Sequence, residues 1–279
     1  MGRRKYWFWG LNALLPLFAV GCSGQGSSSS GTPGGLVLQA FGGPSGYVAA
    51  GVADLDPGVG PQVTCSAPLS DGPCQLTACE FGGVVNPGRG RGNFGPISVS
   101  VGTTSEQLDY VGNGVVTGYA QVHFPPSVTL GTGDTMTFHG DGGAGAPMFD
   151  VSATIPGVGL MTSPVPASDG GAALIDTSGD LSVTWVPISI GQINFQLSGG
   201  SLGGSSPVLV TCAFDGASGT GVVPQKLLSK MKELSGERPA FADLSSMLDA
   251  ATVVDGFTIT TWSYQNSEDA IREVLVTLE

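Results

Sequence analysis

Four side chains suited to acid–base or metal chemistry lie close together along the chain: His123, Asp134, His139 and Asp141. An imidazole exchanges protons near neutral pH or binds a metal ion, and a carboxylate beside it orients the ring. Each histidine lies near the end of an expected strand, so the four residues would form one site if those strands were neighbours. The alternative, which we favour, is that they are polar residues at the ends of separate strands.

Two glycine-rich segments match functional patterns without the secondary structure that those functions need. Gly199–Gly203 fits the G-x-S-x-G pattern of serine hydrolases, in which the serine occupies a sharp turn between a strand and a helix. Gly140–Gly145 fits the G-x-G-x-x-G pattern of dinucleotide sites, which requires a helix directly after the loop. Strand-like sequence follows both segments, so we expect loops. The sequence therefore predicts no catalytic residue and no enzymatic activity.

Two acidic turns, Asp54–Gly58 and Asp141–Gly143, offer the oxygen ligands that calcium accepts. Neither turn has the ligand spacing of a known calcium loop, and Asp and Gly are common in turns for conformational reasons. We therefore expect no metal ion and no cofactor, with a structural calcium ion as the alternative.

The body of the chain has the composition of an all-β protein. Its 46 glycines and 19 prolines among 279 residues separate short runs that are rich in Val, Ile and Thr. A hydrophobic content of 41% argues against disorder of this body. The expected strands are 36–41, 47–53, 62–65, 74–81, 97–101, 118–124, 135–139, 150–155, 180–186, 192–197, 208–214, 256–264 and 271–278.

Periodicity in the second half of the chain distinguishes strands from one helix. Residues 192–197 and 208–214 alternate between apolar and polar, which places one face in a core and the other in water. Residues 224–234 have the spacing of an amphipathic helix, with Pro224 in the first turn. Its apolar face is formed by Leu227, Leu228, Met231 and Leu234.

The strand that contains Trp185 and the later strand that contains Cys212 resemble those of immunoglobulin and fibronectin type III sandwiches, in which a buried tryptophan packs near a strand cysteine. The resemblance covers roughly residues 165–279. It implies an antiparallel, immunoglobulin-like β-sandwich over residues 161–279. Residues 36–160 are expected to be an N-terminal β region, either separate from this sandwich or part of one integrated unit.

Five cysteines are present, and four of them lie in or beside expected strands: Cys65, Cys74, Cys79 and Cys212. An even number of cysteines in an oxidising compartment predicts two disulfides, for which three pairings are possible. A hairpin centred on residues 69–70 would place Cys65 opposite Cys74. We therefore favour Cys65–Cys74, with Cys79–Cys212 as a long-range bridge.

The first 21 residues are organised as an export signal. Met1–Lys5 is basic, and Tyr6–Val20 is uncharged, mostly apolar and too short to span a bilayer. The segment Ala19-Val20-Gly21-Cys22 resembles the lipobox of bacterial lipoproteins, in which a peptidase cleaves before a cysteine that carries the lipid. The resemblance implies that Cys22 is lipidated and that the protein is held at a membrane of the cell envelope.

A stretch rich in glycine and serine, residues 22–35, follows the expected cleavage point. Such a sequence cannot bury enough apolar surface to become ordered, so we expect a flexible tether between the lipid and the folded body. In bacterial lipoproteins an aspartate directly after the lipidated cysteine favours the inner membrane. Ser23 occupies that position here, which indicates the outer membrane.

The charge distribution excludes several kinds of partner. Without residues 1–21 the chain retains 7 basic and 22 acidic residues, for a net charge of −15, and residues 93–225 contain no Lys or Arg. Nucleic-acid binding depends on cations that replace phosphate counterions, so it is not expected. Electrostatic attraction to anionic lipid is disfavoured for the same reason.

The leading hypothesis is a non-catalytic envelope lipoprotein with a structural, adhesive or recognition role toward another envelope protein or a glycan. A glycan-binding module is the second hypothesis, with four candidate aromatic side chains: Tyr110, Tyr119, Trp262 and Tyr264. The third is a hydrolase that uses His123 or His139 with a carboxylate. It requires those groups within hydrogen-bond reach of one another in a concave pocket.

Overall fold

The computed structural model describes the chain from Gly35 onward with several gaps. The described ranges are 35–42, 48–54, 61–66, 68–84, 94–112, 117–119, 122–125, 127–143, 146–166, 171–199, 207–236, 240–265 and 273–279. The predicted signal (1–21), Cys22 and all of the tether except Gly35 lie outside the described residues.

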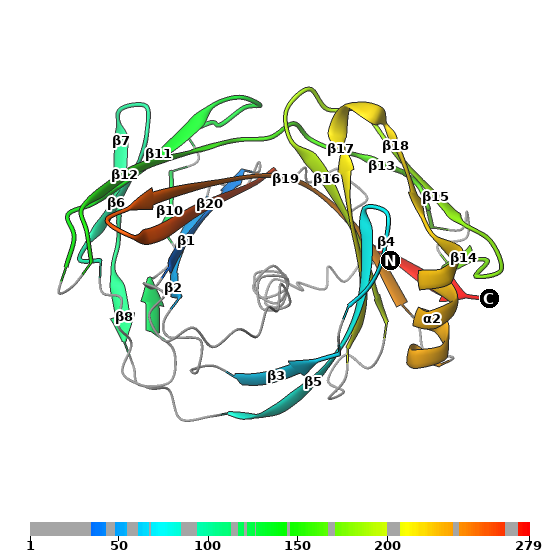
Figure 1. The fold of residues 1–279 in the computed structure, drawn as a ribbon. Helices are drawn as coiled ribbons and strands as arrows, with labels where there is room; N and C mark the ends of the chain where they lie inside the picture. The colour runs from blue at the N-terminus through cyan, green and yellow to red at the C-terminus, as the bar shows by residue number, and fades with distance from the viewer. Residues whose placement is uncertain are drawn as a thin grey trace, which may run out of the picture.

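The largest sheet among these ranges has 12 strands, and it bends strongly in Figure 1. Nine of its strands follow one another in the order β10 (Val122–His123), β2 (Val48–Asp54), β1 (Gly35–Gly42), β20 (Phe257–Gln265), β19 (Ala240–Val254), β16 (Gln192–Gly199), β17 (Val208–Asp215), β5 (Cys74–Val84) and β3 (Pro61–Cys65). Three more pair beside this row: β4 (Leu69–Asp71) with β5, β21 (Glu273–Leu278) with β19, and β14 (Ala173–Ile175) with β21. The pairs β1–β20 and β14–β21 are parallel, and the others are antiparallel. The predicted regions 36–160 and 161–279 thus supply neighbouring strands to one sheet.

Three smaller sheets and two helical segments complete the described fold. One sheet has the order β12 (Phe149–Thr154), β11 (Thr135–Gly140), β6 (Ile97–Val101), β7 (Thr104–Leu108). Another has the order β13 (Met161–Ser163), β15 (Leu181–Trp185), β18 (Thr220–Val223), and the smallest pairs β8 (Tyr110–Gly112) with β9 (Thr117–Tyr119). A 3₁₀ turn, η1 (Gly216–Ser218), precedes β18, and the α-helix is α2 (Gln225–Ser235).

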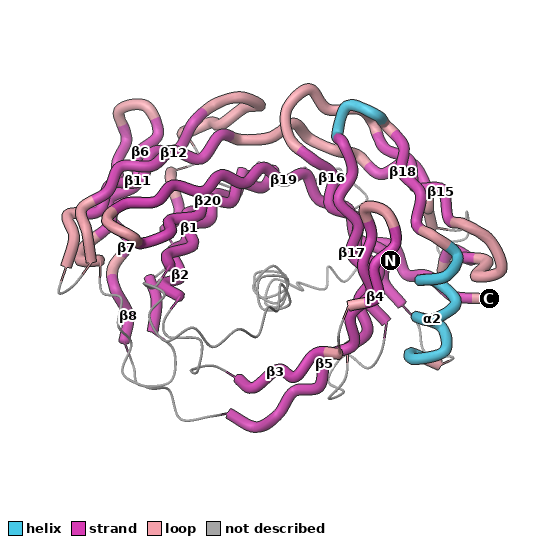
Figure 2. Tube along the Cα trace, in the orientation of Figure 1, coloured by secondary structure: helices cyan, strands magenta, loops and turns pink. Residues whose placement is uncertain are grey.

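Two hydrophobic cores lie on the outer side of the large sheet (Figure 2). In the first, β1 and β20 pack against the four-stranded sheet, and Leu36, Leu38 and Phe138 are fully buried there. In the second, β16, β17 and β19 pack against the three-stranded sheet and α2, around Phe195 and Trp185. Alternate residues of each strand enter a core, as the period of two requires. The described fold is therefore all-β, mostly antiparallel, with sheets packed face to face and a single α-helix, as predicted.

The helix forms where its apolar spacing and its first residues predict it. The Asp180 carboxylate accepts a hydrogen bond of 2.7 Å from the Gln225 backbone N–H, which pairs one of the free donors in the first turn. Leu227, Leu228 and Met231 are fully buried against the strands beneath. The helix ends at Gly236, whose φ of +66° is accessible to glycine without strain.

Both disulfides of the structure use the four predicted cysteines, but the favoured pairing is wrong. The bridges are Cys65–Cys79 and Cys74–Cys212. The chain turns at residues 72–73 rather than at 69–70, so Asp71 lies opposite Cys74 in the β4–β5 pair. Cys74 and Cys79 are five positions apart on β5 and therefore point to opposite faces of the sheet. Cys74 bonds to Cys212, which lies directly opposite on β17, and Cys79 bonds to Cys65, which lies directly opposite on β3.

The resemblance to immunoglobulin-like domains holds at the coarser level of an all-β sandwich. Trp185 is buried and stacks on Phe214 with 5.6 Å between ring centroids, and its indole N–H donates to the Gly216 carbonyl oxygen. The Cys74–Cys212 bridge, however, joins adjacent strands of one sheet, whereas the disulfide of antibody domains joins two sheets. The structure does not show the specific immunoglobulin arrangement.

The longest strand of the described fold was not predicted. β19 spans 15 residues, and its first half is rich in Ala, Leu, Met and Asp, which carry no strand signal of their own. Two short strands, β9 and β10, are found where one strand was expected at residues 118–124. Residues 120–121, which lie between them, are not among the described residues. Short strands such as β7, β13 and β18 were also absent from the sequence-based expectation.

We expect the Cys74–Cys212 bridge to stabilise the fold more than the Cys65–Cys79 bridge. The two bridges close loops with sequence separations of 138 and 14 residues. Chain entropy then gives about 5 and about 3 kcal/mol of unfolding free energy, respectively. Replacing each pair by alanine and measuring urea unfolding tests this order, and equal losses would contradict it. Peptide mapping of the non-reduced chain checks the pairing itself.

Candidate functional site

The structure brings together one cluster of ionisable side chains, around His139 on β11. Strands β11 and β12 form a hairpin whose register places His139 opposite Asp150. Asp150 Oδ1 lies 2.7 Å from His139 Nδ1, and Asp141 Oδ1 lies 3.1 Å from His139 Nε2. Both carboxylates are largely exposed, and the imidazole is 40% exposed.

A carboxylate on each ring nitrogen favours the imidazolium form. The hydrogen bonds to Asp150 and then to Asp141 raise the pKa of His139 above its ordinary value of 6.5. An imidazole held in this way gives up its proton reluctantly and is a poor general base at neutral pH. Within the described residues, the two ring nitrogens are bonded to carboxylates and not to a hydroxyl. We interpret the cluster as an electrostatic clip at the loop end of the β11–β12 hairpin.

The other two residues of the predicted site do not join this cluster. His123 lies exposed on β10, which pairs with β2, so the two histidine strands are not neighbours. Asp134 precedes β11 at its opposite end from His139, roughly 16 Å away along the strand. The Asp134 carboxylate accepts a hydrogen bond of 2.6 Å from the Gly131 backbone N–H and thereby closes a turn. The four-residue acid–base or metal site is therefore not assembled.

Asp150 holds the nearer carboxylate of the cluster but is not among the candidate residues that the sequence indicates. The available signal was the hairpin: residues 135–139 and 150–155 were both expected strands, joined by a glycine-rich turn. Pairing them antiparallel would have placed position 150 opposite position 139.

Only parts of the two glycine-rich motifs lie within the described residues. Gly140–Gly143 leads from β11 into a turn, and strand β12 follows rather than a helix. Gly199 ends β16, and the rest of the G-x-S-x-G segment lies outside the described residues. No group of three or more His, Cys, Asp or Glu side chains in the described ranges is arranged to hold a metal ion. Of the acidic turn 54–58, only Asp54 is described.

Two of the four aromatic candidates for glycan binding are core residues. Tyr119 is buried, donates to the Gly95 carbonyl oxygen and accepts from the Phe94 backbone N–H, and burial raises its pKa to about 12. Tyr110 packs against Tyr119 at the edge of the same core. Tyr119 and Tyr110 therefore have structural roles. Tyr264 is also buried, and burial raises the pKa of its phenol. Its side chain lies on the face of the large sheet that is turned away from both cores.

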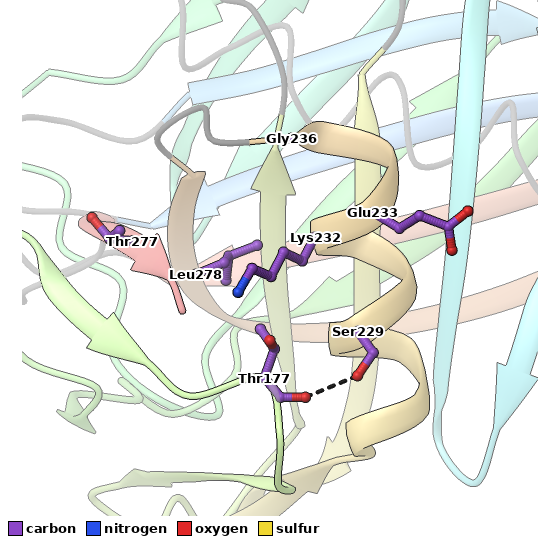
Figure 3. Close-up of a pocket in the computed structure, with 7 residues that line it drawn as sticks. All are labelled: Thr177, Ser229, Lys232, Glu233, Gly236, Thr277 and Leu278. Atoms are coloured by element: carbon purple, nitrogen blue, oxygen red, sulfur yellow. Dashed lines mark hydrogen bonds between the residues drawn. The ribbon is translucent and has the colours of Figure 1, made fainter.

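A cavity of about 640 Å³ lies between α2 and the end of β21 (Figure 3). It is lined by Thr177, Ser229, Lys232, Glu233, Gly236, Thr277 and Leu278. The Ser229 hydroxyl donates to the Thr177 carbonyl oxygen at 2.8 Å, and the Thr177 hydroxyl donates to the Glu279 carbonyl oxygen at 2.6 Å. Lys232 points toward β21, whereas Glu233 points away. No histidine is among the lining residues, and the Ser229 hydroxyl donates its hydrogen to a backbone carbonyl oxygen.

The large sheet also has a second face, which is turned away from both cores and carries many polar side chains. We call it the inner face, because it lies on the inside of the bend in Figures 1 and 2. Its middle carries a row of polar side chains on four adjacent strands, paired directly opposite one another: Gln75, Thr211, Gln196 and Asp243. The next row contains Asn194 and Ser245. These side chains are half-buried or exposed, and amides, hydroxyls and carboxylates can recognise a polar ligand.

The inner face is free of positive charge as far as the structure describes it. None of the 12 strands of the large sheet contains Lys or Arg. Asp243 and Asp249 contribute carboxylates from β19. A ligand with several phosphate or sulfate groups would find no counter-charge on this face.

No known protein family model matches the chain, and a search of curated proteins finds no similar sequence. The described ranges contain no helix that is both long enough and apolar enough to cross a bilayer. The function of this chain must therefore be inferred from its own residues.

We expect Asp150→Asn to lower the pKa of His139 more than Asp141→Asn does, because Asp150 makes the shorter and stronger hydrogen bond. A folded-state pKa above the unfolded value means that the clip stabilises the hairpin fully below about pH 6.5 and loses this effect as pH rises through the folded pKa. NMR titration of the imidazole measures both shifts. A larger shift in Asp141→Asn would contradict the assigned geometry.

Proposed function

We propose that this protein is a non-catalytic recognition protein of the bacterial cell envelope, held at the outer membrane by a lipid on Cys22. The inner face of its large sheet is the binding surface in this proposal. The observation that carries the proposal is the row from Gln75 to Asp243, which spans four strands with polar side chains on the face opposite the cores.

Strand alternation explains why this row can serve as a binding surface. The outer face is occupied, because Ile193, Phe195 and Leu197 of β16 are fully buried in a core. The intervening residues of the same strand, such as Asn194 and Gln196, remain accessible to a partner. Strand pairing fixes the backbone positions from which these polar groups project, and a fixed backbone lowers part of the entropy cost of binding.

The anchor rests on the sequence that precedes the folded body. A basic start, an uncharged apolar stretch and a cysteine after small residues are the features that a lipoprotein peptidase reads. The glycine- and serine-rich residues 23–34 would then let the body reach partners away from the bilayer.

The lipid is tested by comparing the full chain with its Cys22→Ala variant in a bacterium with two membranes. We expect the wild type in the outer-membrane fraction, with an acylated N-terminal cysteine found by mass spectrometry. The variant should be released from that fraction, because it has no thiol to receive the lipid. A wild-type N-terminus at any other residue, or membrane retention of the variant, would refute the anchor.

The binding surface is tested by photo-crosslinking in the same cells. A photoreactive amino acid at Gln196 on the inner face should label an envelope component, to be identified by mass spectrometry. The control position is Ser182, which is exposed on β15 of the outer layer. Equal labelling from both positions, or labelling from neither, would count against recognition through the inner face.

A further inference from the structure

Gln39 on β1 is a buried amide without a partner. The residue is 2% exposed, and its buried Nε2 makes no hydrogen bond. The neighbouring Leu38 and Ala40 point into a core, so alternation places Gln39 on the inner face. Buried polar groups are nearly always hydrogen-bonded, and an unpaired one destabilises the fold. An unpaired amide N–H on the proposed binding face points to a ligand that supplies the missing hydrogen-bond acceptor.

The register places two further functional groups in line with Gln39. Trp262 on β20 lies directly opposite Gln39, and Asp249 on β19 lies directly opposite Trp262. Adjacent strands are about 4.8 Å apart, so Gln39 and Asp249 lie one strand spacing from Trp262 on either side, and all three side chains project from the same face. Trp262 is half-buried and Asp249 is exposed.

Side chains around this row hold it in place. Gln192 Nε2 donates to Asp249 Oδ1 at 3.4 Å, which connects the row to β16. In the next row, Tyr264 stacks on Phe41 with 5.2 Å between ring centroids and an interplanar angle of 14°. An indole bordered by an amide and a carboxylate, beside a packed aromatic pair, is a small aromatic site with a few fixed polar groups.

We propose that Gln39, Trp262 and Asp249 form a binding site for a neutral carbohydrate, with one sugar ring stacked on the indole. This inference rests on the proposed recognition function and identifies its ligand class. A sugar ring has apolar C–H faces that pack on an aromatic ring, and hydroxyl groups around its edge. Those hydroxyls both donate and accept, so one ring can pair with the Gln39 amide and with the Asp249 carboxylate.

Charge and hydrogen-bonding capacity distinguish this ligand from the alternatives. An anionic polymer would meet Asp249 without any Lys or Arg in the described strands around it. An organic cation would suit the indole and the carboxylate, but an ammonium group has no acceptor for the Gln39 N–H. A neutral polyhydroxylated ligand satisfies all three groups.

The site is tested by calorimetric titration of the full chain in a polyoxyethylene detergent, which carries no sugar head group. The probes are cellohexaose, maltohexaose and chitohexaose, with spermine as the cation and heparin as the anion. We expect saturable binding of at least one neutral hexasaccharide and none of heparin. Trp262→Ala should weaken that binding at least about tenfold, the scale on which central aromatic contacts contribute.

Gln39→Met keeps the size of the side chain and removes its polar atoms. We expect this variant to melt at the wild-type temperature or above, because an unpaired amide is lost, and yet to bind the sugar at least about tenfold more weakly. The matched control is Gln107→Met, since Gln107 is exposed on β7 in the four-stranded sheet and donates to Asp109. It should bind as the wild type does.

Three results would overturn the carbohydrate site: no binding of any neutral hexasaccharide, binding that survives both Trp262→Ala and Gln39→Met, or Trp262-dependent binding of spermine alone. If the sugars fail while crosslinking from Gln196 still labels an envelope component, recognition stands with another ligand. If both experiments fail, the proposed function fails with the site.

Discussion

The hydrogen bonding of β19 is the constraint on which the rest of this structure depends. Residues Ala240–Met247 pair with β16, and Ser246–Val254 pair with β20 on the other edge of the strand. The two hydrophobic cores lie on either side of this connection, one beneath β16 and β17 and the other beneath β1 and β20. Without β19, the large sheet would separate into two parts with one core each. The strand therefore makes one continuous inner face out of segments that are far apart in the sequence.

The two faces of the large sheet differ in chemical character. The outer face is apolar and is covered by the smaller sheets and by α2, and the Cys74–Cys212 bridge lies within that core. The inner face carries amides, hydroxyls, carboxylates and an indole, with no cation in the strands described. Because successive residues of a strand point to opposite faces, both properties are encoded in the same short segments.

The ionisable cluster around His139 consists of residue types that often act in catalysis, but here we interpret it as a contact that stabilises one hairpin. The imidazole is held between Asp150 and Asp141 at the exposed loop end of one hairpin. The residues first expected to join it, His123 and Asp134, are placed elsewhere by strand pairing. In the proposals above, function instead depends on residues such as Gln39 and Trp262, whose importance comes from position rather than from reactivity.

The sequence by itself determined the class of fold, most of the strands and the helix near residues 224–234, because the period of two, the glycine and proline punctuation and the apolar spacing of that helix are local signals. It also determined which four cysteines form disulfides. It could not determine the pairing of those cysteines, because two bridges from opposite faces of β5 depend on which strands lie beside it. Nor could it reveal β19, whose composition carries no strand signal and whose extended state depends on hydrogen bonds to β16 and β20. The rows of the inner face, and with them the site of Gln39, Trp262 and Asp249, exist only in the tertiary structure, since register between distant strands decides which side chains meet.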